Sequence, residues 1–375
     1  MTGRATIRTT EPTDRPEVTL AERRTETAMS VGSNYSRLYS HDIGTETSCI
    51  CALPPTGRMH SRDGRIESGP RSRRRVLAAT GGLAAGLVGV AGCLGSTDGV
   101  RVLAAGSLAA AFENGIGPAF ESASGLRYEG EYYGTNAVLR LVEDGTKHPD
   151  VVIGADVELL RERLYPDHAD WDAEFAANEV VIAYAPETAL GSRLAAGEPW
   201  YEVFATADEG AIAISDPDLD PLGYRALLLF ELAERAHELE GFRDAMADKV
   251  ARVADEPQLL AGLENGDRAC AVAYSNMAAE RDVAVRRLDD AYNFGDAAFA
   301  DRYARASYTT DGGHTVEGTP VVYNATVCSD ADAPAAGREF VSFLLENGTL
   351  LTEHGLRVDD SLPRFHGAPP EAIEP

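Results

Sequence analysis

Small polar residues recur in this sequence where an apolar run ends and a helix-like pattern begins. Five such junctions hold Gly106-Ser107, Gly134-Thr135-Asn136, Gly154-Ala155-Asp156, Asp216–Arg225 and Tyr274-Ser275-Asn276. The first turn of a helix has backbone N–H groups without intrahelical partners, and the helix dipole makes this end positive. Hydroxyl and amide donors at such turns therefore suit an oxyanion. Each turn alone is also an ordinary helix cap, so it is their number in one chain that favours a binding site.

These junctions are held in place by predicted strands and helices that alternate from Val100 onward. The predicted strands are Val102–Ala105, Arg127–Tyr133, Val151–Ile153, Glu179–Ala185, Ala211–Ser215, Ala269–Tyr274 and Val321–Val327. The predicted helices are Leu108–Ala123, Asn136–Asp144, Val157–Leu164, Gly223–Leu239, Phe242–Asp248, Glu256–Asn265 and Ala333–Glu346. Such alternation predicts an α/β protein with mainly parallel sheets flanked by helices. Ligands of these sheets bind beyond the carboxyl ends of the strands, where the five junctions lie.

The charge of the chain is strongly negative, but it is not evenly spread. Residues 1–93 hold 13 basic and 9 acidic residues, which leaves 21 basic and 51 acidic residues, a net charge of −30, for residues 94–375. The chain has only two lysines, Lys147 and Lys249. This composition is typical of proteins adapted to high salt, where screening weakens self-repulsion and the acidic surface maintains solubility. It argues against a nucleic-acid partner, which needs basic patches.

The stretch RSRRRVLAATGGLAAGLVGVAGC (71–93) has the pattern of an export signal. Ser72–Leu77 resembles a twin-arginine motif, and Val90–Cys93 resembles a lipobox in which Cys93 is lipidated. The alternative is a transmembrane anchor, although the stretch is short and rich in glycine for one. Export signals lie at chain starts, so we expect residues 1–70 to be a disordered extension and translation to start at Met59, with Met29 the alternative.

The remaining reactive residues do not form a catalytic or metal-binding pattern. Cys270 and Cys328 each lie in an apolar stretch and are expected to be small buried side chains; whether they form a disulfide stays open. The histidines lack the spacing of zinc ligands, and there is no GxSxG or Walker sequence. A hydrolase or an ATPase is therefore not expected.

Five stretches together resemble a known family. They are AAGSL (104–108), PDVVIGADVELL (149–160), FAANEVVIAY (175–184), SDPDLDPLGYRALLLFE (215–231) and GTPVVYNATVCSDADAPAAGREFVSFLLENG (318–348). The chain is similar over roughly 100–357 to the periplasmic-type substrate-binding proteins of molybdate/tungstate ABC importers, in particular their archaeal branch. The resemblance implies a two-lobe periplasmic binding protein type II fold with the ligand cleft between the lobes. The expected lobes are 94–182 with 276–375 and 183–275, and Glu179–Ala185 is one crossing strand.

The resemblance also implies a set of anion-binding residues. Ser107 and Thr135 would donate hydroxyls and amides, Asp220 would approach the metal of the bound anion, and Tyr274 would face the cleft. Further candidates are Gly106, Gly134, Ala155 and Arg225, although an ion pair with the neighbouring aspartates is the favoured role of Arg225. Asp220 is the only expected metal contact, through the bound oxyanion, and its alternative role is a helix cap.

One position departs from the family pattern. The archaeal branch has a glutamate just before this tyrosine, and the residue here is Ala273. Two carboxylates suit expansion of a metal oxyanion toward six oxygen ligands. Because Ala273 carries no carboxylate, it stays open whether an oxyanion bound here reaches six oxygen ligands.

The expected function is therefore that of a receptor without enzymatic activity or cofactor. It is expected to be a monomer, exported and lipid-anchored on the outer side of the cytoplasmic membrane. There it would capture molybdate or tungstate for the permease and ATPase subunits of an ABC importer. The alternatives are a receptor for sulfate or phosphate, or a sensory or enzymatic protein on the same fold.

Overall fold

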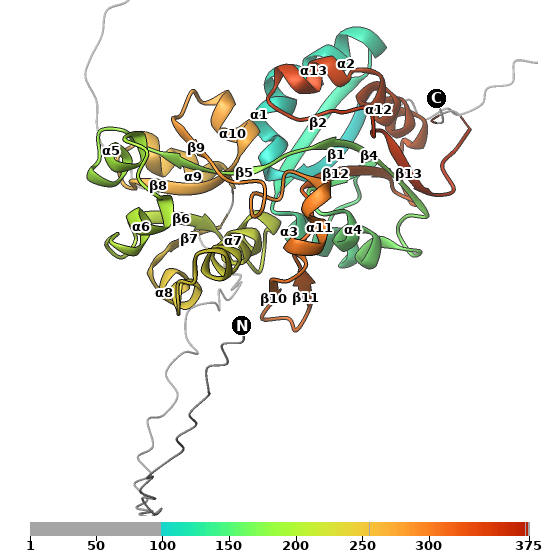
Figure 1. Cartoon of the computed structure of the whole chain (residues 1–375). Helices are drawn as coiled ribbons and strands as arrows, with labels where there is room; N and C mark the ends of the chain where they lie inside the picture. The colour runs from blue at the N-terminus through green and yellow to red at the C-terminus, as the bar shows by residue number, and fades with distance from the viewer. Residues whose placement is uncertain (1–98, 255, 372, 374–375) are drawn as a thin grey trace, which may run out of the picture. The chain divides into compact units, whose positions relative to one another are not determined.

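The computed structural model describes residues 99–254, 256–371 and 373. The predicted extension 1–70, the signal 71–93 and the lipidation site Cys93 lie outside the described residues. Within them, the chain forms two mixed sheets flanked by helices (Figure 1).

The first sheet has the strand order β13-β4-β12-β3-β1-β2. Its strands are β1 (Gly99–Ala105), β2 (Arg127–Tyr133), β3 (Val151–Gly154), β4 (Trp171–Ala177), β12 (Val322–Val327) and β13 (Arg364–Gly367). β1 pairs in parallel with β2 and β3, whereas β12 is antiparallel to β3 and β4, and β13 is antiparallel to β4. β1 to β4 therefore share one direction, so their carboxyl ends meet at one edge of the sheet.

The second sheet has the strand order β7-β6-β8-β5-β9. Its strands are β5 (Val180–Tyr184), β6 (Ile212–Ser215), β7 (Ala251–Val253), β8 (Cys270–Tyr274) and β9 (Val285–Arg287). β6 pairs in parallel with β7 and β8, and β5 is antiparallel to β8 and β9. All strands except β5 thus run in one direction. The predicted α/β class is confirmed, and both sheets are mixed, because β5, β12 and β13 pair antiparallel with their neighbours.

Helices cover both faces of the first sheet because successive side chains of a strand point to opposite faces. In β1, Val102 belongs to the large core cluster, whereas Leu103 belongs to a smaller cluster under α3 and α4. The helices of this half are η1 (Gly106–Leu108), α1 (Ala109–Ala111), η2 (Phe112–Ile116), α2 (Gly117–Ser124), α3 (Thr135–Glu143), α4 (Val157–Leu164), α12 (Pro334–Glu346) and α13 (Gly348–Glu353). Among these helices, η1, α3 and α4 follow β1, β2 and β3 and therefore begin at the carboxyl edge of the sheet.

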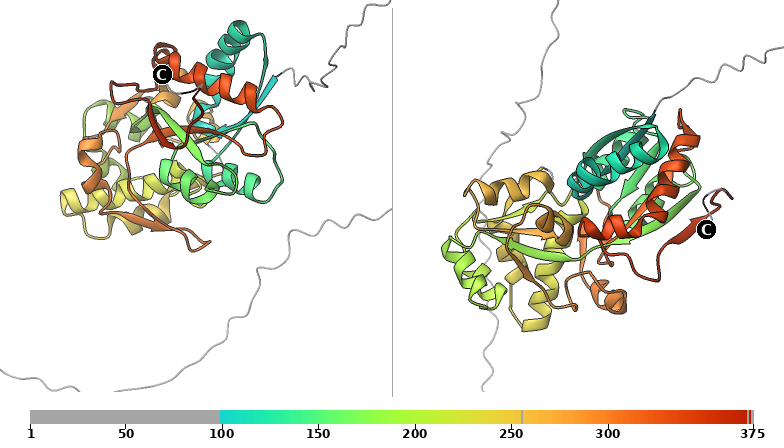
Figure 2. Two further views of the ribbon diagram at one scale, coloured as in Figure 1. Left: turned by 90° about the vertical axis from the view of Figure 1, so that its right-hand side faces the viewer. Right: turned by 90° about the horizontal axis from the view of Figure 1, so that it is seen from above.

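The second sheet is likewise packed between helices (Figure 2). These are α5 (Ala189–Ala195), α6 (Trp200–Ala205), α7 (Pro221–His237), α8 (Phe242–Lys249), α9 (Glu256–Glu264) and α10 (Ser275–Glu280). Helix α7 is the longest of them, and most of its residues are buried, so it serves as the central support of this half.

The two halves are joined by the segment between β4 and β5, which the views show running from one sheet into the other (Figures 1 and 2). The return segment after β9 contains η3 (Ala297–Phe299), α11 (Ala300–Tyr303) and the hairpin of β10 (Ser307–Thr309) and β11 (Thr315–Glu317). The predicted two-lobe architecture is confirmed. The predicted lobe boundary at 275/276 stays a prediction; the strand pairing itself places β9 in the second sheet.

Cys270 and Cys328 are both buried and carry free thiols. Burial raises the pKa of each thiol to about 12, so both stay protonated at neutral pH. No helix in the described part of the chain has the length and apolar character needed to cross a membrane.

Candidate functional site

Ser107 lies at the end of β1, inside the short helix η1, and is 3% exposed. Its Oγ accepts a hydrogen bond from the hydroxyl of Tyr323 at 3.0 Å. Its carbonyl oxygen accepts one from Asn276 Nδ2 at 2.7 Å, and Asn276 is in turn held by Asn178 in the crossing segment. Side chains from both lobes therefore fix the position of Ser107.

Thr135 is the first residue of α3 and is fully buried. Its Oγ1 accepts a hydrogen bond from the backbone N–H of Ala155 at 3.1 Å. The preceding Gly134 faces the second lobe: a Cβ atom there would lie 2.4 Å from the Leu219 carbonyl oxygen and 2.8 Å from Asp220 Cβ. Glycine is thus required because the lobes approach each other closely at this point.

Asp220 is 1% exposed and begins helix α7 as its N-cap, with Oδ1 accepting a hydrogen bond from Leu222 N at 3.2 Å. The cap role that the sequence left open is therefore present. The same side chain lies against Gly134 of the other lobe, so Asp220 also belongs to the interface between the lobes.

Arg225 and Tyr274 lie in the buried centre of this interface. Arg225 Nη1 donates to the Tyr274 hydroxyl at 2.8 Å and to the Ala155 carbonyl at 2.9 Å. Arg225 Nη2 forms an ion pair with Asp156 Oδ2 at 2.9 Å, and the same oxygen accepts from Tyr224 at 2.7 Å. The sequence predicted an ion pair within the acidic segment next to Arg225; the partner in the structure, Asp156, comes from the other lobe.

Burial and neighbouring charges keep the Tyr274 phenol protonated and the Arg225 guanidinium charged. Burial raises the pKa of Tyr274 well above its ordinary value, Arg225 lowers it, and Tyr323, Asp220 and Glu256 raise it further, so the phenol stays protonated. Burial lowers the pKa of Arg225, but Tyr274, Tyr224 and Asp156 together raise it beyond its ordinary value. The guanidinium therefore stays charged.

The hydroxyls of Ser107, Thr135 and Tyr274 share one hydrogen-bonding arrangement. The oxygen of each already accepts a hydrogen bond from the protein. A hydroxyl in this state keeps its own proton for donation. The three groups are thus prepared to donate to an acceptor, as an oxyanion requires.

Other buried donors in the same segments have no hydrogen-bond partner among the described residues. They are Asn136 Nδ2 on the first turn of α3, Ser215 Oγ at the end of β6, and Arg225 Nε. Buried polar atoms are nearly always paired, so such atoms point to a bound ion, ligand or water.

The five junctions differ in how their helices begin. Asp156 caps α4 and Asp220 caps α7 with side-chain oxygens. The other three, at η1, α3 and α10, begin without a side-chain cap. The ordinary cap explanation therefore holds for two junctions, and the first N–H groups of the other three are not capped by side chains.

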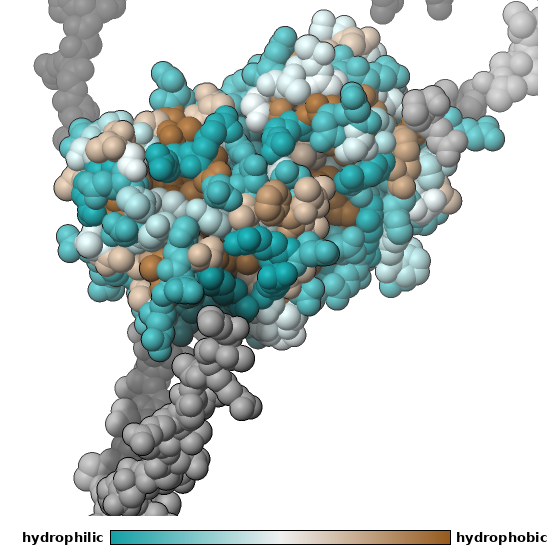
Figure 3. Space-filling model, in the orientation of Figure 1, coloured by the Kyte–Doolittle hydropathy of each residue, from teal (hydrophilic) through white to brown (hydrophobic). Residues whose placement is uncertain are grey.

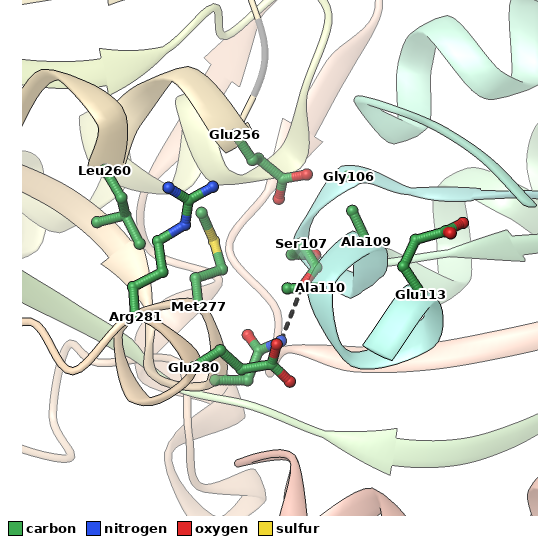
Figure 4. Close-up of a pocket in the computed structure, with 11 residues that line it drawn as sticks. Gly106, Ser107, Ala109, Ala110, Glu113, Glu256, Leu260, Met277, Glu280 and Arg281 are labelled. Atoms are coloured by element: carbon green, nitrogen blue, oxygen red, sulfur yellow. Dashed lines mark hydrogen bonds between the residues drawn. The ribbon is translucent and has the colours of Figure 1, made fainter. Parts of the chain in front are cut away.

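A cavity of about 240 Å³ lies between the lobes beside this centre (Figure 4). Ser107, Ala109 and Glu113 line it from the first lobe, and Glu256 and Arg281 face them from the second. Among the predicted site residues only Gly106 and Ser107 line this cavity. Thr135, Ala155, Asp220, Arg225 and Tyr274 are buried and do not line it.

The structure thus brings the predicted residues to one interface, and hydrogen bonds join Thr135, Ala155, Arg225 and Tyr274 in series. The sequence did not identify Asp156, Tyr323 or Glu256 as part of this region. Asp156 lies in one of the five junctions, but its position in the sequence indicated no particular role. Tyr323 lies inside an ordinary apolar strand, and Glu256 resembles any acidic residue in a first helical turn, so neither had a distinguishing signal.

Comparison with known proteins adds independent information. The family model of the bacterial extracellular solute-binding proteins matches residues 100–357. An uncharacterized solute-binding protein of Halobacterium salinarum is 47% identical over 307 residues, covering 81% of this chain and 98% of that protein. A Haloferax volcanii protein, named as a candidate ABC transporter molybdenum-binding protein, is 38% identical over 81% of this chain and 98% of its own length.

A more distant relative is the molybdate/tungstate-binding protein of Thermococcus kodakarensis. It is 30% identical over 273 residues, which cover 65% of this chain and 77% of that protein. The region that the family model matches, residues 100–357, includes all five junctions. The chain therefore belongs to the bacterial extracellular solute-binding proteins, a family of substrate receptors rather than enzymes.

Proposed function

We propose that this receptor binds molybdate or tungstate between its lobes and delivers it to an ABC importer. The observation that carries the proposal is the set of three buried hydroxyls, on Ser107, Thr135 and Tyr274, that each keep a proton to donate. The charged Arg225, whose Nε has no partner among the described residues, adds a donor and a positive charge. A small tetrahedral oxyanion, which only accepts hydrogen bonds, matches this donor set.

Asp220 selects among such anions. A buried carboxylate repels the oxygens of sulfate or phosphate unless a proton is added. The metal of molybdate or tungstate is a hard centre that accepts further oxygen ligands, so a carboxylate can approach it favourably. The names of the Haloferax and Thermococcus relatives support the same ligands.

The remaining parts of the proposal concern cellular placement. We infer export by the twin-arginine route, lipid attachment at Cys93 and action as a monomer beside the permease and ATPase subunits. Export and lipid attachment rest on the sequence pattern of residues 71–93, which lie outside the described residues. Lobe closure would remove water from the anion and create the surface that a transporter recognises.

Isothermal titration calorimetry of the purified protein in molar KCl tests the ligand. Tungstate and molybdate should each bind tightly, and sulfate and phosphate should not. Binding of sulfate or phosphate in preference to the metal oxyanions, or of none of the four, would overturn the proposal.

Two substitutions at one position test the role of the hydroxyls. Thr135→Val removes the hydroxyl and should weaken tungstate binding roughly 10- to 100-fold, the effect of losing a hydrogen bond to a charged group. Thr135→Ser keeps the hydroxyl and should bind almost as the unmodified protein does. Thermal unfolding of both variants separates a loss of binding from a loss of fold, because the valine also removes the acceptor of Ala155 N–H. Equal affinities for the two variants would show that this hydroxyl does not contact the anion.

A further inference from the structure

Asn178 lies between β4 and β5, where the chain crosses from one lobe to the other, and its side chain is fully buried. Its backbone N–H donates to the Val321 carbonyl at 3.0 Å, which ties it to the return segment as well. Its side-chain Oδ1 accepts from the backbone N–H of Glu179 at 2.9 Å. A backbone N–H is only a donor, so this contact fixes which side-chain atom of Asn178 is the oxygen. The two N–H donors of Nδ2 are therefore left for other partners.

One of these donors holds the backbone of Ser107 through Asn276. Asn178 Nδ2 donates to Asn276 Oδ1 at 2.7 Å. Asn276 then donates from its own Nδ2 to the Ser107 carbonyl at 2.7 Å (dashed line in Figure 4). A carbonyl oxygen only accepts, so this end of the series has a fixed direction too. Both ends thus require the same orientation of the Asn178 amide.

The other donor determines the direction of the Ser107 hydroxyl, through Tyr323. Asn178 Nδ2 donates to the Tyr323 hydroxyl oxygen at 3.1 Å. This phenol is fully buried, and burial raises its pKa, so it keeps its own proton. Asn178 Nδ2 has no lone pair to accept that proton, whereas Ser107 Oγ, at 3.0 Å from the phenol oxygen, has one. Tyr323 therefore donates to Ser107, and the proton of Ser107 is left for a further acceptor.

We propose that Asn178 is a positioning residue for the bound anion: through Tyr323, it directs the O–H of Ser107 toward the anion between the lobes. The inference rests on the proposed function. The side chains of this network, on Asn178, Asn276, Tyr323 and Ser107, are at most 3% exposed, so bulk water does not offer them alternative partners. In such a buried network each hydrogen bond sets the direction of the next one. The crossing segment therefore joins the lobes and also orients a donor of the site.

Asn178→Asp tests the proposal because it reverses the first hydrogen bond of the series with little change of shape. A carboxylate only accepts hydrogen bonds, so Tyr323 would donate to it and Ser107 would donate to Tyr323. The proton of Ser107 would then no longer be available to the anion. Calorimetry in molar KCl, with tungstate as the probe, should show binding at least about tenfold weaker, as expected when a hydrogen bond to a charged ligand is lost.

A second substitution separates this effect from repulsion between the new carboxylate and the anion. Ser107→Ala removes the hydroxyl and should itself weaken tungstate binding roughly 10- to 100-fold. Repulsion acts with and without the hydroxyl, whereas the effect that passes through the hydroxyl is absent once Ser107 is replaced. Asn178→Asp should therefore weaken binding by a smaller factor in the Ser107→Ala protein than in the unmodified protein. A merely structural role of Asn178 would not produce this difference.

Tyr323→Phe serves if Asn178→Asp does not fold. It breaks the link between Asn178 and Ser107, so the anion itself must fix the Ser107 hydroxyl in one of three staggered positions. Tungstate binding should weaken about threefold, and it should not weaken further when Ser107→Ala is already present. Tyr128→Phe is the matched control, because it removes a phenol hydroxyl that is bonded to Tyr132 at 2.9 Å, and it should leave the affinity unchanged. Thermal unfolding checks that each variant is folded.

The outcomes separate the two proposals. If the unmodified protein binds neither tungstate nor molybdate, the proposed function fails and this inference fails with it. If it binds tungstate, but Asn178→Asp or Tyr323→Phe has no effect or the same effect with and without Ser107→Ala, only this inference is overturned.

Discussion

At the scale of single residues, the buried ion pair of Arg225 and Asp156 holds one lobe against the other. Their side chains are 1% and 7% exposed, and their atoms lie 2.9 Å apart. Removing one partner of such a pair leaves a buried charge without compensation. Asp156→Asn should therefore lower the free energy of unfolding by about 3–5 kcal/mol. Urea unfolding in molar KCl measures this change, and the asparagine still offers an oxygen to cap α4.

An exposed ion pair of the same chain provides the control for this prediction. Arg127 and Glu129 pair at 2.8 Å, but their side chains are 65% and 51% exposed. Arg127→Ala should change stability by only about 0–1 kcal/mol. A second comparison adds Arg225→Met to Asp156→Asn, which removes the uncompensated charge and should restore part of the loss. Similar small effects of Asp156→Asn and Arg127→Ala would contradict the bridging role.

The same scale shows which site residues a sequence can reveal. Gly134, Thr135 and Asp220 carry a local signal, because each stands between an apolar run and a helix start. Strand direction predicts that Gly134 and Thr135 lie at the carboxyl edge of one sheet and Asp220 at the carboxyl edge of the other. The partners of these residues carry no such signal: Tyr323 donates to Ser107 across 216 residues of sequence. Contacts of this kind are fixed by the packing of the whole fold, so the ion pair of Arg225 was assigned to nearby aspartates when its partner lies in the other lobe.

At the scale of elements, the sequence predicted the bounds of some helices and strands correctly where apolar and polar residues alternate regularly. The strand Arg127–Tyr133 and the helix Val157–Leu164 have the bounds expected. The helix predicted at Leu108–Ala123 is instead divided into η1, α1, the π-helical turn η2 and α2. Pro118 lies in the first turn of α2, and a residue without an N–H cannot continue the regular hydrogen-bond series. Strands β4, β9 and β13 were missed because they are short or depend on distant partners.

The β10–β11 hairpin is another element that the sequence did not predict, and it contacts both lobes at the interface. Tyr308 donates its hydroxyl to Asp218 Oδ1 at 3.2 Å, and the backbone N–H of Asp311 donates to the same oxygen at 2.9 Å. His314 Nδ1 lies 3.4 Å from Glu162 Oε1, which belongs to α4 of the first lobe. The hairpin thus connects α4 to the segment that leads into α7.

Asp218→Ala removes the acceptor for both hairpin contacts. The loss of these two partly exposed hydrogen bonds, about 1–2 kcal/mol, should destabilise the closed state and speed tungstate release about 5- to 30-fold. Association should change little, because the open lobes do not yet make these contacts. Stopped-flow measurement of tungstate release checks the prediction. Asp311→Ala is the control, since Asp311 participates through its backbone N–H; equal acceleration in both variants would contradict the assigned contact.

At the scale of the whole molecule, the acidic surface sets the conditions in which the fold is stable. The chain has a net charge of −26, and the face shown in Figure 3 is mostly hydrophilic, with smaller hydrophobic patches. Even if every basic residue paired with an acidic one, the net charge of −26 would remain, because the chain contains 60 acidic and only 34 basic residues. The compact state therefore concentrates repulsion that the unfolded chain relieves by expansion.

Added salt should stabilise this protein. The way in which Tm depends on the KCl concentration shows which effect of salt stabilises the fold. The screening length falls from about 10 Å at 0.1 M to about 3 Å at 1 M salt, which is shorter than the spacing of most surface charges. If screening dominates, Tm should rise steeply up to roughly 1 M KCl and then level off. A gain of about 3 kcal/mol corresponds to roughly 5 °C for a protein of this size. Choline chloride, which screens equally, should act as KCl does. A rise that continues linearly to 3 M, or one that requires potassium, would show that exclusion of salt from the surface or specific cation binding stabilises the fold instead.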